Sequence, residues 1–134
     1  MQTLKNTLGK KKRLKSRKAI DGLFKSGKSF SLFPFRVIYT VTDEPGHAMQ
    51  AGFSAPAKKF KKAVDRNRIK RLMREAYRLQ KGELTNALKK NERYMVVFFI
   101  YTGSNIAEYK DVQLKMEAAI KKLEKINENH IANT

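Results

Sequence analysis

Hydrophobic residues recur along this chain with two different periods, and these periods predict the order of its strands and helices. Residues 35–42 alternate between apolar and polar positions, and residues 49–54 form a second short apolar segment, as strands do. Residues 94–101 are continuously apolar, which predicts a strand buried on both faces. Turn-forming residues at 43–46 separate the first two segments and predict a β-hairpin.

Three other segments carry apolar residues at helical spacing. The first, 16–26, begins at Ser16 as an N-cap and ends before Gly27. The second, 63–80, is followed by Gly82, which would close the helix. The third, 107–127, follows Asn105 and Glu108, which resemble a capping box. The resulting order, α-β-β-α-β-α, predicts an α+β fold in which helices pack on a small mixed sheet as a two-layer sandwich.

A chain of 134 residues fits a single domain over residues 1–134. We expect residues 1–13 to form a flexible basic arm and residues 128–134 a flexible tail. The run 95–101 is too short to span a bilayer, and no apolar segment of the kind found in secretory signals follows the basic start. The lack of cysteine excludes disulfides and thiol catalysis and fits the cytoplasm.

Charge adds the first indication of function. The formal net charge is +18, although 41% of the residues are hydrophobic, so the chain is a folded domain rather than a disordered basic tail. Such self-repulsion suggests a polyanionic partner that relieves it. Nucleic acid is the commonest such partner, and an anionic membrane surface is the second.

The basic segment 66–78 separates into two faces on a helical wheel. The predicted core face consists of Ile69, Leu72, Met73, Ala76 and Tyr77. The other face presents Asn67, Lys70, Arg71, Arg74 and Arg78, with Glu75 as the only internal counter-charge. A merely solvated helix face would mix the signs of its charges, whereas this one mostly repels itself. Arginine predominates on it, and its planar fork suits phosphate.

The same segment carries a recognisable motif, which reads Phe60-x-x-Ala63-x-x-Arg66-Asn67-Arg68-Ile69-Lys70-Arg71-x-Met73-Arg74. It resembles the Arg-Asn-Arg signature of the protein subunit of bacterial ribonuclease P. Further similarity extends over Arg13-Leu14-Lys15, the segment ending at Gly27, residues 37–40, and Gly52-Phe53-Ser54 with the following Lys58-Lys59. The family has the same element order, with a left-handed crossover through the signature helix where general rules favour a right-handed one.

The resemblance implies an enzyme whose catalytic subunit is RNA and which removes the 5′ leader of precursor tRNA. The protein subunit would assist this reaction. The protein would bind the catalytic RNA and the single-stranded leader, and would strengthen the binding of functional metal ions. By position, the residues facing the catalytic RNA would be Arg66, Asn67, Arg68, Lys70, Arg71, Arg74, Arg78, Lys58 and Lys59. Those lining the leader cleft would be Phe24, Tyr39, Ile20 and Arg36.

One of these positions departs from the family. Ile20 stands where the family often has an aromatic residue, and isoleucine cannot stack on a base as a ring does. Phe24 and Tyr39 are therefore the better stacking candidates, although both would also serve as ordinary core residues. Asn67 has a similar alternative, because asparagine near a helix start can bond to the backbone.

The sequence offers no protein-based catalytic centre or metal site. Asp43-Glu44 is the only adjacent acidic pair and lies in a predicted turn, while His47 and His130 lack partners at ligand spacing. We therefore expect no protein-bound cofactor, a magnesium requirement belonging to the RNA–protein holoenzyme, no membrane association and no obligate protein partner. A general RNA-binding protein, a membrane-surface protein and a stand-alone nuclease are the alternatives to the resemblance.

Overall fold

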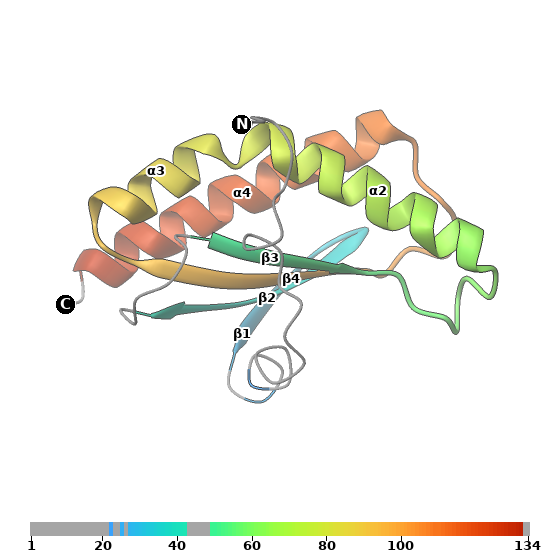
Figure 1. The fold of residues 1–134 in the computed structure, drawn as a ribbon, viewed down its shortest axis with the longest axis horizontal. Coiled ribbons are helices and arrows are strands. Elements are labelled where there is room, and N and C mark those ends of the chain that lie inside the picture. Colours follow the sequence, from blue (N-terminus) through green and yellow to red (C-terminus); the bar gives the residue numbers. More distant parts are fainter. Residues whose placement is uncertain (1–21, 23–24, 26, 43–48, 133–134) are drawn as a thin grey trace, which may run out of the picture.

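The structure is a computed structural model that describes Gly22, Lys25, residues 27–42 and residues 49–132. Its elements in these ranges are β1 (Lys28–Leu32), β2 (Phe35–Thr42), β3 (Met49–Ser54), α2 (Ala63–Gln80), α3 (Gly82–Lys90), β4 (Tyr94–Tyr101) and α4 (Tyr109–Ala132). Figure 1 shows the three helices lying over one side of a single sheet. The predicted α+β sandwich is confirmed. Of the helix predicted over 16–26, only Gly22 and Lys25 are described, and both are helical.

The sheet has four strands in the order β1-β2-β4-β3. Strand β4 pairs antiparallel with β2, placing Phe35 opposite Tyr101, and parallel with β3, placing Phe53 opposite Phe99. The predicted hairpin between residues 35–42 and 49–54 is therefore wrong, because β4 lies between these strands. The most apolar strand takes an inner position, where both of its edges are paired. The turn predicted at 43–46 lies outside the described residues.

The parallel strands β3 and β4 are joined through α2 and α3, which makes this connection the crossover of the fold. Its left-handedness stays a prediction from the resemblance. Strand β1, which the sequence pattern missed, forms an antiparallel hairpin with β2 in which Phe30 lies opposite Val37. Its polar serines hid the alternation of Phe30 and Leu32.

The core lies between the sheet and the helices. Phe35 and Val37 of β2 and Phe99 of β4 point to this side and are fully buried. We call it the core face of the sheet. The rings of Phe53, Tyr77 and Phe99 meet there, with centroids 5.4–5.8 Å apart. Helix α4 completes the layer with the stripe that its spacing predicted: Val112, Met116, Ala119, Ile120 and Leu123 are buried, and Ile126 is half-buried.

Helix boundaries differ from the prediction at three places. Gly82 does not close a helix in the left-handed conformation but begins α3, because Lys81 stays in the right-handed helical region and the chain continues. Helix α4 begins at Tyr109, with the Val112 amide donating to the Glu108 carbonyl at 3.1 Å, so no Asn105–Glu108 capping box forms. The helix also continues to Ala132, beyond the predicted end at Asn127.

Candidate nucleic-acid interface

Helix α2 sorts its side chains as the wheel predicted. Ile69, Met73, Ala76 and Tyr77 are buried against the sheet and α4, and Leu72 is half-buried. The side away from the core carries exposed Asn67, Arg68 and Arg71 and half-buried Lys70. No acidic residue stands between Asp65 and Glu75 to balance these cations. The exposed side of α2 is therefore a continuous positive surface, which a phosphate backbone can neutralise.

The loop before α2 adds four exposed lysines to this surface: Lys58, Lys59, Lys61 and Lys62. The loop is anchored at its centre by Phe60, which is 7% exposed and packs its ring 5.9 Å from that of Tyr101. Lys59 Nζ also donates to the Thr102 carbonyl at 2.5 Å. We refer to these four lysines together with Asn67, Arg68, Lys70 and Arg71 as the basic surface.

Arg66 contributes to the basic surface mainly by positioning it. Its Nη1 donates to the carbonyl of Phe60 at 2.7 Å and to that of Lys61 at 2.9 Å. The guanidinium thus ties the loop to the first turn of α2. This internal use was not expected from the sequence, which placed Arg66 against RNA; a second arginine two residues later, Arg68, is exposed instead.

Arg74 and Arg78 are also partly engaged within the protein. The Arg74 guanidinium lies over the ring of Phe53, 5.8 Å from its centroid, and the residue is half-buried. Arg78 forms an ion pair with Glu75, whose second carboxylate oxygen lies 3.3 Å from the arginine Nε. Glu75 is therefore the internal counter-charge that the sequence suggested. Among the cations of α2, the most available to a partner are exposed Arg68 and Arg71 and half-buried Lys70.

The side of the sheet opposite the core face has its own composition. Alternation along β2 and β4 places Arg36 beside Ile100 and Ile38 beside Phe98 on this side. Ile38 is buried, whereas Phe98 and Ile100 are half-buried and Arg36 is exposed. We call it the Arg36 face. A half-buried apolar surface with a cation at its edge suits unpaired bases, which stack on rings while arginine contacts phosphate.

The comparisons with known proteins identify the family. Residues 8–124 match the family model described as Ribonuclease P. The chain belongs to the ribonuclease P protein family. It is 36% identical over 114 residues to the ribonuclease P protein component of Porphyromonas gingivalis, covering 84% of this chain and 83% of that protein. It is 34% identical over 100 residues to the Clostridioides difficile component, covering 75% and 81%.

The fold is shared with a solved member of that family. The structure of the Staphylococcus aureus RNase P protein aligns with a TM-score of 0.68 and 23% identity, over 84% of this chain and 94% of that chain. The family resemblance drawn from the Arg-Asn-Arg segment is thereby confirmed, as is the family's mixed α+β architecture.

The residues expected around the leader do not all come together. Tyr39 is on the core face, where its ring lies 6.0 Å from that of Phe30, whereas Arg36 is three residues earlier and on the opposite face. Positions an odd number of residues apart along a strand point to opposite faces, so the two side chains lie on different sides of the sheet. Tyr39 is half-buried with its ring against Phe30, and its contact with the leader stays a prediction. Phe24 and Ile20 lie outside the described residues.

Phe98 is the candidate that sequence reasoning missed. Strand β4 was expected to be buried on both faces, but its residues alternate strictly between half-buried and buried. Tyr94, Val96, Phe98 and Ile100 are the half-buried set. The sequence signal was present, because an aromatic pair at Phe98-Phe99 must send one ring to each face.

Burial raises the pKa of the Tyr77 phenol, but this residue belongs to the core. Within the described ranges, no three His, Cys, Asp or Glu side chains gather as a metal-binding group. No helix among the described residues is long and apolar enough to cross a membrane.

Proposed function

We propose that this chain acts as the protein component of ribonuclease P, binding the RNA component through the basic surface of α2 and its preceding loop. The observation that carries the proposal is the run of cations from Arg66 to Arg74, uninterrupted by any acidic residue and partly exposed on a helix anchored in the core. Each cation that meets a phosphate releases counterions, which gives affinity and strong salt dependence without sequence reading.

In this proposal the phosphodiester bond of precursor tRNA is cleaved by the RNA component, and the protein contributes binding. Magnesium would be held by the RNA–protein complex, where phosphates supply oxygen ligands. The described side chains do not fit a protein-held site for it, since they contain no cluster of suitable ligands. No step of the reaction is therefore assigned to a metal on this chain. With this RNA partner, we expect the protein to act in the cytoplasm.

We infer further that the single-stranded leader of precursor tRNA lies along the Arg36 face. Phe98 would stack on a base, and Arg36 at the edge would contact the backbone. In this proposal Phe98, which lies on the same face as Arg36, takes the stacking role expected of Tyr39. The ring of Tyr39 packs on the core side. The RNA component and the leader would then bind on opposite sides of the sheet, because α2 covers the side away from the Arg36 face (Figure 1).

The test is reconstitution of the full chain with a bacterial ribonuclease P RNA on precursor tRNA at low magnesium. We expect the protein to raise the rate of leader removal, because its cations reduce the demand for divalent ions around the RNA. The protein without RNA should cleave nothing. A rate that the protein leaves unchanged would contradict this function and favour a general RNA-binding protein, whereas cleavage by RNA-free protein would favour a nuclease.

A further inference from the structure

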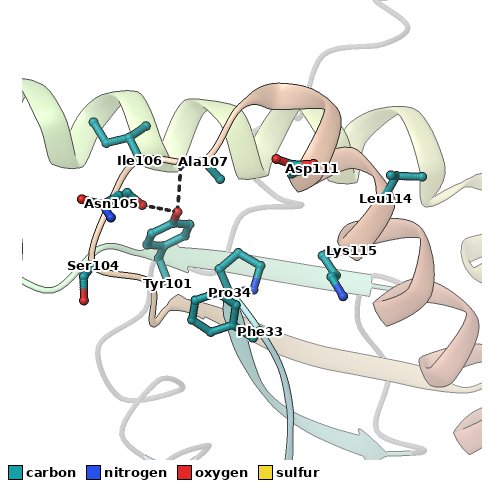
Figure 2. Close-up of a pocket in the computed structure, with 11 residues that line it drawn as sticks. Phe33, Pro34, Tyr101, Ser104, Asn105, Ile106, Ala107, Asp111, Leu114 and Lys115 are labelled. Atoms are coloured by element: carbon teal, nitrogen blue, oxygen red, sulfur yellow. Dashed lines mark hydrogen bonds between the residues drawn. The ribbon is translucent and has the colours of Figure 1, made fainter.

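A pocket of about 500 Å³ lies between the β1–β2 turn and the first turns of α4, and the proposed function does not use it. Figure 2 shows its three walls: the β1–β2 turn with Phe33 and Pro34, the segment after β4, and the first turns of α4 with Asp111 and Leu114. This volume is within the range of small-molecule sites, about 300–1,000 Å³. The pocket is large enough for a nucleobase with its sugar.

The wall formed by the segment after β4 is held in place by Tyr101. Its hydroxyl donates to the Asn105 carbonyl at 2.6 Å and accepts from the Ala107 amide at 3.0 Å (Figure 2). Gly103 lies so close to the ring that an added Cβ would be 3.0 Å from Tyr101 Cε2. The segment is therefore fixed before any ligand arrives, which lowers the entropy cost of binding.

The lining combines exposed apolar surface with a few polar groups. Phe33 is 69% exposed and Leu114 is 56% exposed, and both line the same pocket, so they offer adjoining apolar surface to a ligand. Asp111 and Lys115 stand one helical turn apart on the α4 wall. In the described part of the chain neither carboxylate nor ammonium has a hydrogen bond or ion pair, so both are available to a ligand.

The position of the pocket indicates what occupies it. Tyr101 lines the pocket and also packs on Phe60 of the basic surface loop, and Lys59 of that loop bonds to Thr102 beside it. The pocket therefore adjoins the loop of the basic surface, on which the proposed RNA strand lies. A second copy of this chain is disfavoured, because each copy carries a net charge of +18.

We propose that this pocket takes one unpaired nucleobase of the bound RNA, with the base against Phe33 and the adjacent phosphate near Lys115. Guanine suits the site best among the bases, because the Asp111 carboxylate can only accept and the Watson–Crick edge of guanine offers adjacent N1–H and N2–H donors. The proposal rests on the proposed function for its RNA and adds a base-specific subsite to a surface that otherwise reads only phosphates.

The first test uses two short single-stranded RNAs, UUGUU and UUUUU, and amide NMR spectra of the isotope-labelled full chain. We expect UUGUU to shift the amides of Ser104, Ile106 and Leu114, and Phe33→Ala to weaken its binding at least about fivefold, as loss of a stacking platform does. Leu79→Ala is the matched control, because Leu79 is 53% exposed but lies on α2 outside the pocket. The control should bind as the wild type does.

The second test addresses the base. Asp111→Asn should reduce the preference for UUGUU over UUUUU, while Glu117→Gln, which removes the same charge from an exposed position of α4, should retain it. Equal binding of the two RNAs by the wild type, or pocket amides that do not move, would overturn the proposal. So would Phe33→Ala with unchanged RNA affinity, the result expected if the pocket instead receives a protein partner. If the chain activates ribonuclease P RNA but these tests fail, the nucleobase site in the pocket is refuted and the proposed function stands.

Discussion

Arg66, a residue of the signature segment, stabilises the fold in addition to its expected contact with RNA. Its guanidinium bonds to two consecutive carbonyls of the loop that carries the exposed lysines. We predict that Arg66→Ala lowers the free energy of unfolding by about 1–3 kcal/mol, because it removes two charge-assisted hydrogen bonds, of which the one to the Phe60 carbonyl is partly buried. It should also speed hydrogen exchange at the Phe60 amide, which bonds to the Pro56 carbonyl at 3.1 Å.

Arg68→Ala is the matched control for this change, because Arg68 is exposed on the same turn of α2. Its unfolding free energy should stay within about 0.5 kcal/mol of the wild type, as at other surface positions. RNA affinity should fall in both variants. Equal stability of Arg66→Ala and Arg68→Ala in denaturant melts would show that Arg66 does not hold the loop.

Tyr77 is a second residue whose chemistry can be tested alone. Its hydroxyl is buried without a hydrogen-bond partner among the described residues, and burial raises its pKa. The folded chain therefore keeps this proton where the unfolded chain releases it, so stability is fully present below about pH 10 and is lost as the pH rises above that. Tyr77→Phe should remove this alkaline loss.

Tyr77→Phe should also be neutral or stabilising at pH 7, because it deletes a desolvated hydroxyl without opening a cavity. Urea unfolding of both proteins at pH 7 and above pH 10 gives the comparison. A variant that is clearly less stable at pH 7 would mean that the hydroxyl has a partner in solution. Parallel pH profiles for the two proteins would show that Tyr77 does not titrate on unfolding.

Among the secondary-structure elements, periodicity predicted whether a segment is a strand or a helix, but not which strands pair in the sheet. The bounds of α2, β2 and β3 follow from apolar spacing, and those of β4 follow from its continuous apolar run. The pairing of β3 with β4 instead of β2 depends on which strand gains most from an inner position, and this is a property of the whole sheet. Strand β1 and helix α3 are short and polar, so their patterns were too weak to detect.

The candidate interface was predictable to a similar degree. The wheel identified the exposed side of α2 correctly, because helical spacing fixes which residues face away from the core. It could not reveal that Arg66 bonds to the loop or that Arg74 lies over Phe53, since these contacts join different elements. The wheel also says nothing of strands, where alternation places Tyr39 and Arg36 on opposite faces of the sheet.

The two faces of β4 give a prediction at the element scale. Phe99 is fully buried in the core face, so Phe99→Ala should cost about 3–5 kcal/mol of stability. Phe98 on the Arg36 face is half-buried, so Phe98→Ala should cost about 1–2 kcal/mol. In the reconstituted enzyme, Phe98→Ala should weaken binding of precursor tRNA by about 1–3 kcal/mol while leaving mature tRNA unaffected.

Equal losses for precursor and mature tRNA would place the leader elsewhere than on the Arg36 face. Phe99→Ala does not serve as a control for binding, because its unfolding would lower the affinity for every RNA. Ser31→Ala is the better control, since Ser31 lies opposite Arg36 in the register on the adjacent strand and offers no ring to a base. Its affinity for precursor tRNA should match that of the wild type.

At the scale of the whole molecule, the sheet separates two proposed RNA contacts. The helices over the core face carry the basic surface, and the other side of the sheet carries Arg36 and Phe98 (Figure 1). A net charge of +18 attracts RNA to every side of the chain, so affinity alone cannot identify the binding surface. The salt dependence of the affinity can identify it, because each phosphate contact adds to the slope of log affinity against log salt.

The exposed cations of α2 are the proposed contact with the RNA component. Its most direct test is the affinity for ribonuclease P RNA measured over a range of salt concentrations, for the wild type, Arg68→Ala/Arg71→Ala and the control Lys89→Ala/Lys90→Ala. Both variants lose two charges, but Lys89 and Lys90 lie at the end of α3. We predict that the slope of log affinity against log salt falls by about one unit per cation in the α2 variant and little in the control. An unchanged slope for the α2 variant, or equal changes in both, would contradict the proposed contact.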